Sequence, residues 1–278
     1  MSIEFPEAQI LAKEMNSTLK GKVIDSYSLR EYEKMQRIGF LNKEINDFKM
    51  LVGKRVLGAT SSGNTIRLKL ENQFNLIITP EYGGVILYQE KKVEEPKFHL
   101  KLDFADDSII TIRMTSMGVI YAVDDGNLDK VYIYRRDFLG APSLDDPRQT
   151  LEHFKVALSL KNTQLKPMLV GKDAVTVGLS NSAFQDILFR ARINPKRKTG
   201  NLRDDEVTSL YESIRQLIEE RVMLGGKDEF IDLHGRRGRY MPLMGSNMKD
   251  KTCTRCGSLV ESIPLGGGKV YFCPNCQK

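Results

Sequence analysis

The feature of this sequence that most constrains its fold is a set of four cysteines close to its C-terminal end. Cys253, Cys256, Cys273 and Cys276 form two Cys-x-x-Cys pairs with 16 residues between them. Four thiolates at this spacing are typical of one tetrahedral zinc ion, and an all-cysteine set leaves no coordination position open for a substrate. The pattern predicts a structural zinc site. The Gly266-Gly267-Gly268 run between the pairs predicts a hairpin that the metal holds rigid.

The rest of the chain must supply the hydrophobic core, because about 26 residues cannot. At 278 residues, with 41% hydrophobic and 28% charged residues, the chain has room for about two globular domains. It contains no apolar run of roughly 20 residues, which excludes a membrane-spanning protein, and its first residues lack the layout of a signal peptide. We therefore expect a cytoplasmic protein, in which reduced thiols favour metal binding over disulfides.

Charge is distributed unevenly along the chain. Residues 1–146 carry 20 Lys and Arg against 22 Asp and Glu, a net charge of −2, whereas residues 147–278 carry 22 against 14, a net charge of +8. A basic half that also carries the cysteines suggests contact with a polyanion. A well-solvated surface is the alternative reading of the same charges.

The first half of the chain has the pattern of a β-rich domain. Residues 6–20 have the apolar spacing of a helix, with Ile10, Leu11, Met15 and Leu19 on one face. From about 22 to 136, eight or so short alternating segments are separated by turn signals, which favours an antiparallel sandwich or barrel. Residues 138–150, rich in Pro, Asp and Gly, have the composition of a linker.

The second half has a helical pattern. Apolar spacing predicts helices over 149–160, 164–170, 181–192 and 204–224, followed by a loop or weak hairpin over 227–250. The expected fold class is a multidomain α+β protein. Its parts are a β-sandwich domain with flanking helices (1–137), the linker, a helical domain with a loop (151–250) and a zinc finger (251–278).

Residues 178–198 are the second candidate for a functional site. Asn181 opens a predicted helix, and the free backbone N–H groups and positive dipole of such a first turn suit a phosphate. Cationic residues follow it: Arg190, Arg192, Lys196, Arg197 and Lys198. The alternative is an ordinary capping asparagine on a helix that is followed by a solvated basic turn.

Three segments together resemble the formamidopyrimidine-DNA glycosylase/endonuclease VIII family over essentially the whole chain. Glu4-Phe5-Pro6-Glu7 is similar to the family's N-terminal pattern. Gly178-Leu179-Ser180-Asn181, with Leu188-Phe189, is similar to its helix–two-turn–helix signature. Cys273-Pro274-Asn275-Cys276-Gln277 matches the end of its zinc finger. Three such matches in the family's order are highly specific.

The resemblance implies a fold and a partner. Family members join an N-terminal β-sandwich to a helix–two-turn–helix domain with a zinc finger, bind double-stranded DNA between them and are monomeric. Asn181 would then bind a backbone phosphate and Lys269 would stand in for the finger's arginine. Tyr82 would be the nearest candidate for the residue that fills the gap left by a flipped base. Arg236 and Arg237 lie in the region that covers that base in the family.

At the family's active site the sequence departs from the pattern. The family's nucleophile is an N-terminal proline amine, which attacks the sugar C1′ of an extruded nucleotide while the adjacent glutamate handles protons. Here Ile3 takes the position of that proline, so the amine would belong to Ser2, displaced by one residue from Glu4. Asn64 replaces a family lysine, Thr115-Ser116-Met117-Gly118 lacks the family's arginine, and Gly268 replaces the finger's arginine.

Two classes of function remain open. The first is a binding protein for damaged or distorted DNA whose active site is degraded but whose two lobes still bind the phosphate backbone. The alternative is an active DNA N-glycosylase with abasic-site lyase activity, which would use the Ser2 amine and Glu4. A second alternative is an inactive scaffold that binds structured RNA.

Overall fold

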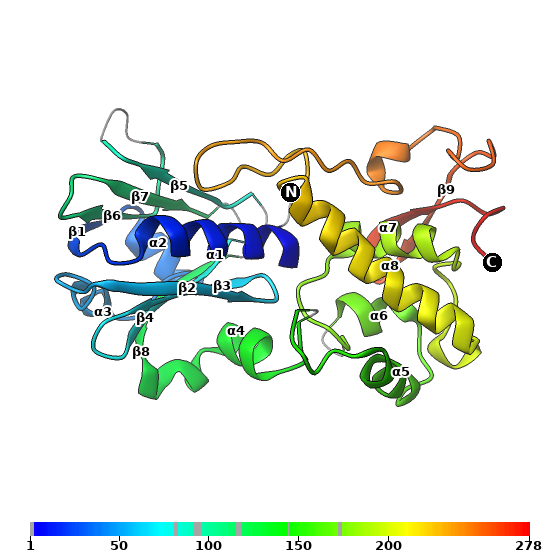
Figure 1. Ribbon diagram of the computed structural model, residues 1–278, viewed down its shortest axis with the longest axis horizontal. Helices are drawn as coiled ribbons and strands as arrows, with labels where there is room; N and C mark the ends of the chain where they lie inside the picture. Colours follow the sequence, from blue (N-terminus) through cyan, green and yellow to red (C-terminus); the bar gives the residue numbers. More distant parts are fainter. Residues whose placement is uncertain (1–2, 81–82, 92–95, 115–117, 144, 172–173) are drawn as a thin grey trace. The chain divides into compact units, whose positions relative to one another are not determined.

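A computed structural model of the chain describes residues 3–80, 83–91, 96–114, 118–143, 145–171 and 174–278. These residues fold into two units (Figure 1). The first unit comprises Met1–Gly140 and Leu224–Arg239, and the second comprises Ala141–Met223 and Tyr240–Lys278. Among the described residues, no helix is long and apolar enough to cross a bilayer.

The first unit contains two four-stranded antiparallel sheets. One has the strand order β1-β6-β7-β5 and the other β2-β3-β4-β8. The strands are β1 (Ile24–Leu29), β2 (Val56–Ser62), β3 (Thr65–Leu70), β4 (Phe74–Thr79), β5 (Val85–Gln89), β6 (Leu100–Phe104), β7 (Ile109–Arg113) and β8 (Val119–Asp124). The expected β-rich N-terminal domain is confirmed.

One hydrophobic core joins these two sheets into a sandwich. On β3, Ile66, Leu68 and Leu70 are buried while Lys69 is exposed, which is the period of two expected of a strand with one buried face. The same cluster includes Leu102 of β6 in the opposite sheet. Alternation in the sequence therefore fixes which face of each strand enters the core.

The first helix, α1 (Phe5–Leu19), runs along the sandwich (Figure 1). Pro6 occupies its first turn, and Glu4 and Glu7 form a capping box in which the Glu4 N–H donates to Glu7 Oε2 at 3.1 Å. Leu11, Met15 and Leu19 are fully buried. The helix predicted over 6–20 is thus present and faces the sandwich core.

Short elements complete the first unit. Around the sandwich lie α2 (Tyr32–Arg37), α3 (Asn46–Lys49), η1 (Asp125–Lys130), α4 (Tyr132–Tyr134) and η2 (Arg135–Leu139). Leu128 and Tyr134 from the last three pack on Ile77 of β4, on the face of that sheet opposite the main core. This packing leads the chain to the end of the first unit at Gly140.

A later segment of the chain returns to the first unit. Residues 224–239 follow the long helix of the second unit, yet Phe230 and Leu233 are fully buried in the core of the sandwich. The Leu233 carbonyl accepts a hydrogen bond from the Tyr88 N–H of β5 at 2.8 Å. The weak hairpin expected over 227–250 is present only as the isolated pair Ile231–Arg237.

The second unit is helical and ends in a hairpin. Its elements are α5 (Leu151–Ser159), α6 (Leu165–Val170), α7 (Asn181–Ala191), η3 (Thr199–Asn201), α8 (Asp204–Met223), η4 (Ser246–Met248), β9 (Glu261–Leu265) and β10 (Gly268–Phe272). The four predicted helices are all found within one or two residues of their expected ends. Phe189 of α7 packs with Tyr271 of the hairpin and with Cys253 and Cys273 in one cluster.

Candidate nucleic-acid interface and metal centre

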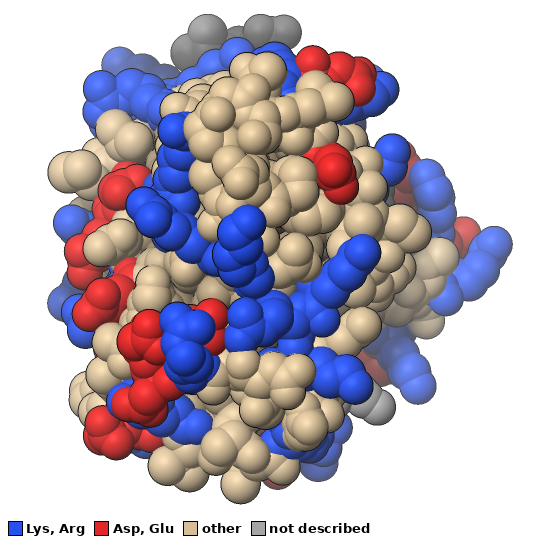
Figure 2. Space-filling model, turned by 90° about the vertical axis from the view of Figure 1, so that its right-hand side faces the viewer, with Lys and Arg blue, Asp and Glu red and all other residues tan. Residues whose placement is uncertain are grey.

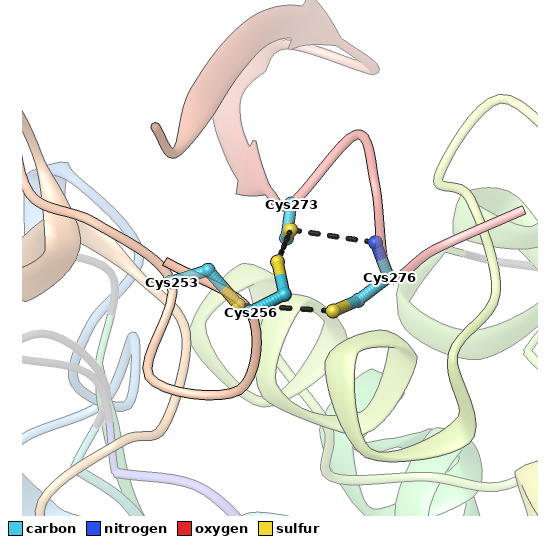
Figure 3. Close-up of side chains that lie close together, drawn as sticks. All are labelled: Cys253, Cys256, Cys273 and Cys276. Carbon is cyan, nitrogen blue, oxygen red and sulfur yellow. Dashed lines mark hydrogen bonds between the residues drawn. The ribbon is translucent and has the colours of Figure 1, made fainter. Parts of the chain in front are cut away.

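The four cysteines converge on one point in the second unit (Figure 3). Their Sγ atoms all lie within 4.8 Å of one another, with 3.9 Å between Cys253 and Cys276 and 3.5 Å between Cys256 and Cys273. Four sulfurs about 2.3 Å from a tetrahedral zinc ion would be separated by about 3.8 Å, so the arrangement fits that metal. The expected clustering of the four cysteines is confirmed.

Local backbone geometry explains how the two cysteine pairs meet. In each pair a backbone N–H points at the first sulfur: the Arg255 N–H at Cys253 Sγ and the Cys276 N–H at Cys273 Sγ, both at 3.4 Å. Between the pairs, β9 and β10 are joined by Gly266 and Gly267, which have φ angles of 51° and 77°. A two-residue hairpin turn with positive φ at both positions favours glycine, as the sequence predicted.

The hairpin is attached to α7 by side-chain amides. Asn181 Nδ2 donates to the Lys269 carbonyl at 3.0 Å, and one turn later Gln185 Oε1 accepts from the Tyr271 N–H at 2.7 Å. Gln277, fully buried behind the last cysteine, donates to the Ile193 carbonyl at 2.9 Å. Asn181 is therefore positioned beside the hairpin.

Lys166 is a second polar group beside the hairpin. It was not among the site residues predicted from the sequence. It lies in the first turn of α6, is 7% exposed, and donates from Nζ to the Leu265 carbonyl at 2.6 Å. Burial lowers the pKa of its ammonium group. A Cβ built on Gly268 would lie 3.5 Å from both Lys166 Nζ and Asn181 Nδ2. A lysine inside the apolar run from Leu165 to Leu169 was the signal that could have indicated it.

Asn181 retains capacity for a further interaction. Its Oδ1 atom is buried and has no hydrogen-bond partner within the part of the chain that the structure describes. Ser180 caps the helix with a side-chain oxygen that accepts from the Ser182 N–H, so Asn181 is the first helical residue rather than the cap. Ser180, not Asn181, therefore caps the helix.

Arg190 does not face the hairpin end of α7. Its guanidinium is 8% exposed and contacts Asp186 at 3.3 Å, Glu220 of α8 at 2.7 Å and the Tyr240 hydroxyl at 3.0 Å. The Arg190 guanidinium lowers the pKa of Glu220. In this structure Arg190 joins α7 to α8.

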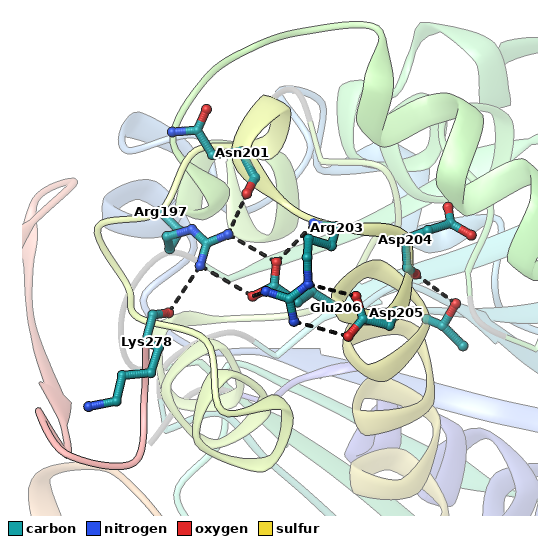
Figure 4. A network of polar contacts seen from close by, with 8 residues as sticks. Arg197, Asn201, Arg203, Asp204, Asp205, Glu206 and Lys278 are labelled. Carbon is teal, nitrogen blue, oxygen red and sulfur yellow. Dashed lines mark hydrogen bonds and ion pairs between the residues drawn. The ribbon is translucent and has the colours of Figure 1, made fainter.

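The remaining cations of this segment lie at the other end of α7. Arg197 binds Glu206 and the backbone oxygens of Asn201 and Lys278 (Figure 4), whereas Lys196 and Lys198 are exposed. Because α7 has 11 residues, about 16 Å of helix separates its Asn181 end from its Arg192 end. The structure does not bring Lys196, Arg197 or Lys198 to Asn181.

In the first unit, Glu4 is buried at the start of α1. It is 1% exposed, and its Oε1 atom lies 3.7 Å from the Nζ atom of Lys227, which is also buried. The Lys227 N–H in turn donates to Glu7 Oε1 at 3.1 Å. Glu4 therefore belongs to an anchor between α1 and the segment 224–239. Ser2, its expected partner, lies outside the described residues.

The other residues of the first unit that were expected to contact DNA differ in their surroundings. Arg236 is paired with Asp232 at 2.6 Å and with Glu14 of α1 at 2.7 Å, which fixes the segment 224–239 on α1 a second time. Arg237 is exposed. Tyr82 lies outside the described residues, as do Thr115, Ser116 and Met117.

Comparison with known proteins identifies this architecture. The family model described as the formamidopyrimidine-DNA glycosylase H2TH domain matches residues 139–230. Formamidopyrimidine-DNA glycosylases of Brevibacillus brevis and Pelotomaculum thermopropionicum are 27% and 28% identical over 280 and 282 residues, covering 99% of this chain and of each relative. The chain belongs to the formamidopyrimidine-DNA glycosylase/endonuclease VIII family.

Solved structures of the family share the fold over its full length. The Lactococcus lactis enzyme, in a complex with DNA that contains an abasic site, superimposes with a TM-score of 0.85 at 22% identity, covering 99% of both chains. The Thermus thermophilus protein gives a TM-score of 0.83 at 20% identity, covering 99% of this chain and 98% of the other. This chain thus has the DNA-binding fold of the family's glycosylases.

The structure shows the neighbours of three residues at which the sequence is expected to depart from the family pattern. Asn64, in place of a lysine, lies in the β2–β3 turn, and its Oδ1 accepts a hydrogen bond from Arg136 Nη2 at 2.6 Å. Ile3, in place of the proline, is 2% exposed and packs in the sandwich core. Gly268, in place of the finger's arginine, faces Asn181 and Lys166.

Proposed function

We propose that this protein binds damaged or distorted double-stranded DNA by its sugar-phosphate backbone, and that Asn181, Lys269 and Lys166 form the phosphate contact. The observation that carries the proposal is the attachment of the hairpin to the start of α7, where the side-chain donors of Asn181 and Lys166 lie beside Gly268 and the exposed Lys269 follows it. Contacts of this kind hold a duplex in position without reading its sequence.

The electrostatics of this place suit an anion. The first turn of α7 has backbone N–H groups without helical partners and the positive end of the helix dipole. Lys269 is exposed at the hairpin, and Lys166 adds a buried ammonium group 2.6 Å from the Leu265 carbonyl. A phosphate oxygen that displaced the Lys269 carbonyl from Asn181 Nδ2 would gain a donor already fixed in place.

Zinc at the four cysteines would have a structural role. The sulfur positions fit a tetrahedral ion, and four thiolates leave no position for water or substrate. The ion would hold the two knuckles together, and through them the hairpin against α7. It supplies no step of a reaction in this proposal.

Binding is favoured over the family's chemistry because the nucleophile position has changed. Ile3 replaces the family's N-terminal proline and is buried in the sandwich core, where it cannot approach a sugar. A one-residue displacement of the amine is about 3.3 Å of chain, enough to disrupt an attack geometry. Relatives with solved structures include a complex with DNA that contains an abasic site, which supports a duplex as ligand.

An active DNA N-glycosylase and abasic-site lyase is the second candidate function. It is favoured by the retained Glu4, whose carboxylate lies 3.7 Å from the Lys227 ammonium, and by relatives named as glycosylases over 99% of the chain. In this candidate the Ser2 amine would form the Schiff base with the sugar and Glu4 would move the protons.

The binding proposal is tested with Asn181→Ala, measured by fluorescence anisotropy on a duplex with a central abasic-site analogue. Loss of one fixed phosphate donor should weaken binding by about tenfold, equivalent to about 1.4 kcal/mol. Arg215→Ala, an exposed change on α8, is the control and should leave affinity unchanged. Equal affinity of Asn181→Ala and wild type would contradict the proposal. If the protein bound an RNA duplex more tightly than the DNA duplex, RNA and not DNA would be its ligand.

The second candidate is tested by borohydride trapping on a natural abasic-site duplex. A covalent adduct mapped to the N-terminal residue, and lost in Glu4→Gln, would establish the lyase. Tight binding without any adduct, unchanged by Glu4→Gln, would eliminate it and leave the binding function standing.

A further inference from the structure

A second group of cations lies at the opposite end of α7 from Asn181. Figure 2, which shows the right-hand side of the view in Figure 1, has Lys and Arg side chains spread across the middle of that face. Five exposed cations lie on segments that are joined by hydrogen bonds. We call them the basic corner: Lys161, Arg192, Lys196, Lys198 and Lys278.

Hydrogen bonds to backbone groups join the segments that carry the basic corner. The Lys278 N–H donates to the Arg192 carbonyl at 3.1 Å, and the Asn194 N–H donates to the Lys278 carbonyl at 2.8 Å. Lys198 pairs with Gln164, and the Thr199 side chain bonds the Lys161 carbonyl. Three segments distant in sequence are therefore joined where the cations emerge.

The acidic residues nearest in sequence are neutralised by other partners. At the start of α8, Glu206 binds Arg197 at 3.0 Å and Asp205 binds Arg203 at 3.0 Å (Figure 4). Asp204 binds Lys155 at 2.8 Å. Since these carboxylates already have cations of their own, they do not cancel the positive charge of the basic corner.

The basic corner and the phosphate contact at Asn181 include residues at opposite ends of α7. Its 11 residues set Asn181 and Arg192 about 16 Å apart, which is about five base pairs of duplex. Concentrated, fixed positive charge at that distance attracts a phosphate backbone and releases its counterions.

We propose that the basic corner is a second contact for the sugar-phosphate backbone of duplex DNA, separate from the Asn181 contact. This second contact rests on the proposed DNA-binding function and adds a further binding surface to that function. The phosphates come either from the flank of the same duplex or from a second duplex. In both cases the corner adds affinity without sequence preference, because lysines contact phosphates and not base edges.

The test reverses two charges of the corner in the full-length, zinc-loaded protein. Lys196→Glu with Lys198→Glu is compared with Lys43→Glu with Lys49→Glu, two exposed lysines of the first unit that give the same change in net charge. Each protein is titrated with a duplex of about 4 base pairs closed by a loop, which is too short to span both contacts, and with one of about 40 base pairs. Zinc content and circular dichroism verify that both variants are folded.

If the flank is the source, the corner variant loses about tenfold affinity for the long duplex, and its salt-dependence slope falls by about 2, while short-duplex affinity matches the control. If a second duplex is the source, wild type binds two short duplexes at saturation and the corner variant binds one. Either result supports the proposal.

Two results overturn it. The first is a corner variant that matches the control in long-duplex affinity and in the number of short duplexes bound. The second is an equal loss for short and long duplexes, which would make the corner part of the Asn181 contact. Failure of wild type to bind either duplex would instead refute the proposed DNA-binding function.

Discussion

At the scale of single residues, Glu4 and Lys227 form a buried ion pair in the first unit. Both side chains are more than nine-tenths buried, and their charged atoms lie 3.7 Å apart. A buried charge that loses its partner remains desolvated, which is costly. The pair therefore anchors the segment 224–239 to α1, whatever chemistry Glu4 performs.

Lys227→Met should lower the free energy of unfolding by about 3 kcal/mol, because it leaves the Glu4 carboxylate buried beside an apolar chain. Urea denaturation followed by circular dichroism measures the change. Lys227→Arg keeps the cation and should cost less than about 1 kcal/mol. The double variant Glu4→Gln with Lys227→Met should recover part of the loss, and a double variant less stable than Lys227→Met would contradict the account.

The roles of some residues could be predicted from the sequence, and the roles of others could not. The cysteine spacing and the glycine run predicted the metal cluster and the hairpin because both depend on local geometry. Lys166 and the inward position of Arg190 were not predictable, because each depends on which element packs against it. The sequence of a helix does not indicate whether a basic residue on it faces solvent, a carboxylate or a phosphate.

At the scale of elements, a polar network joins α7 to α8 and to the segment that leads to the cysteines. Asp186, almost fully buried, accepts hydrogen bonds from the Tyr240 hydroxyl at 2.6 Å and from the Leu243 N–H at 3.2 Å. Burial raises the pKa of Asp186, and the Tyr240 hydroxyl and the Arg190 charge oppose that rise. The network gives the buried carboxyl of Asp186 hydrogen-bond partners inside the second unit.

Tyr240→Phe should destabilise the protein by about 1–3 kcal/mol, since a buried carboxylate oxygen loses its hydroxyl donor. The substitution also raises the folded-state pKa of Asp186 further above its unfolded value. A carboxyl with a raised folded pKa contributes stability at low pH that is lost as pH rises through that pKa. Urea midpoints should therefore differ more from wild type at pH 8 than at pH 5, and a difference that is larger at pH 5 would refute this assignment.

Most helices and strands could be predicted from the sequence, but the parts of the structure that they pack against could not. Alternation in 22–136 and apolar spacing in the second half indicated strands and helices whose ends agree closely with the structure. The return of residues 224–239 to the first unit was not predicted, because Phe230 and Leu233 gave no sign of which core they enter. Gly238 was a missed signal: a Cβ there would lie 2.2 Å from the Lys227 carbonyl oxygen.

At the scale of the whole molecule, composition and fold agree. The excess of positive charge in residues 147–278 falls mostly in the second unit, which carries the cysteine cluster, Asn181 and the basic corner. The family fold covers 99% of the chain, and the four cysteines cluster in the second unit.

The central claim, that the metal-held hairpin and Asn181 together bind that backbone, is tested most directly by duplex affinity in Cys256→Ser. With one thiolate removed, the cluster should lose its metal and the hairpin its fixed position on α7, while the sandwich core of the first unit keeps its stability. We predict loss of bound zinc and a decrease of at least about tenfold in affinity for an abasic-site duplex. Affinity within about twofold of wild type, with zinc lost, would contradict the account.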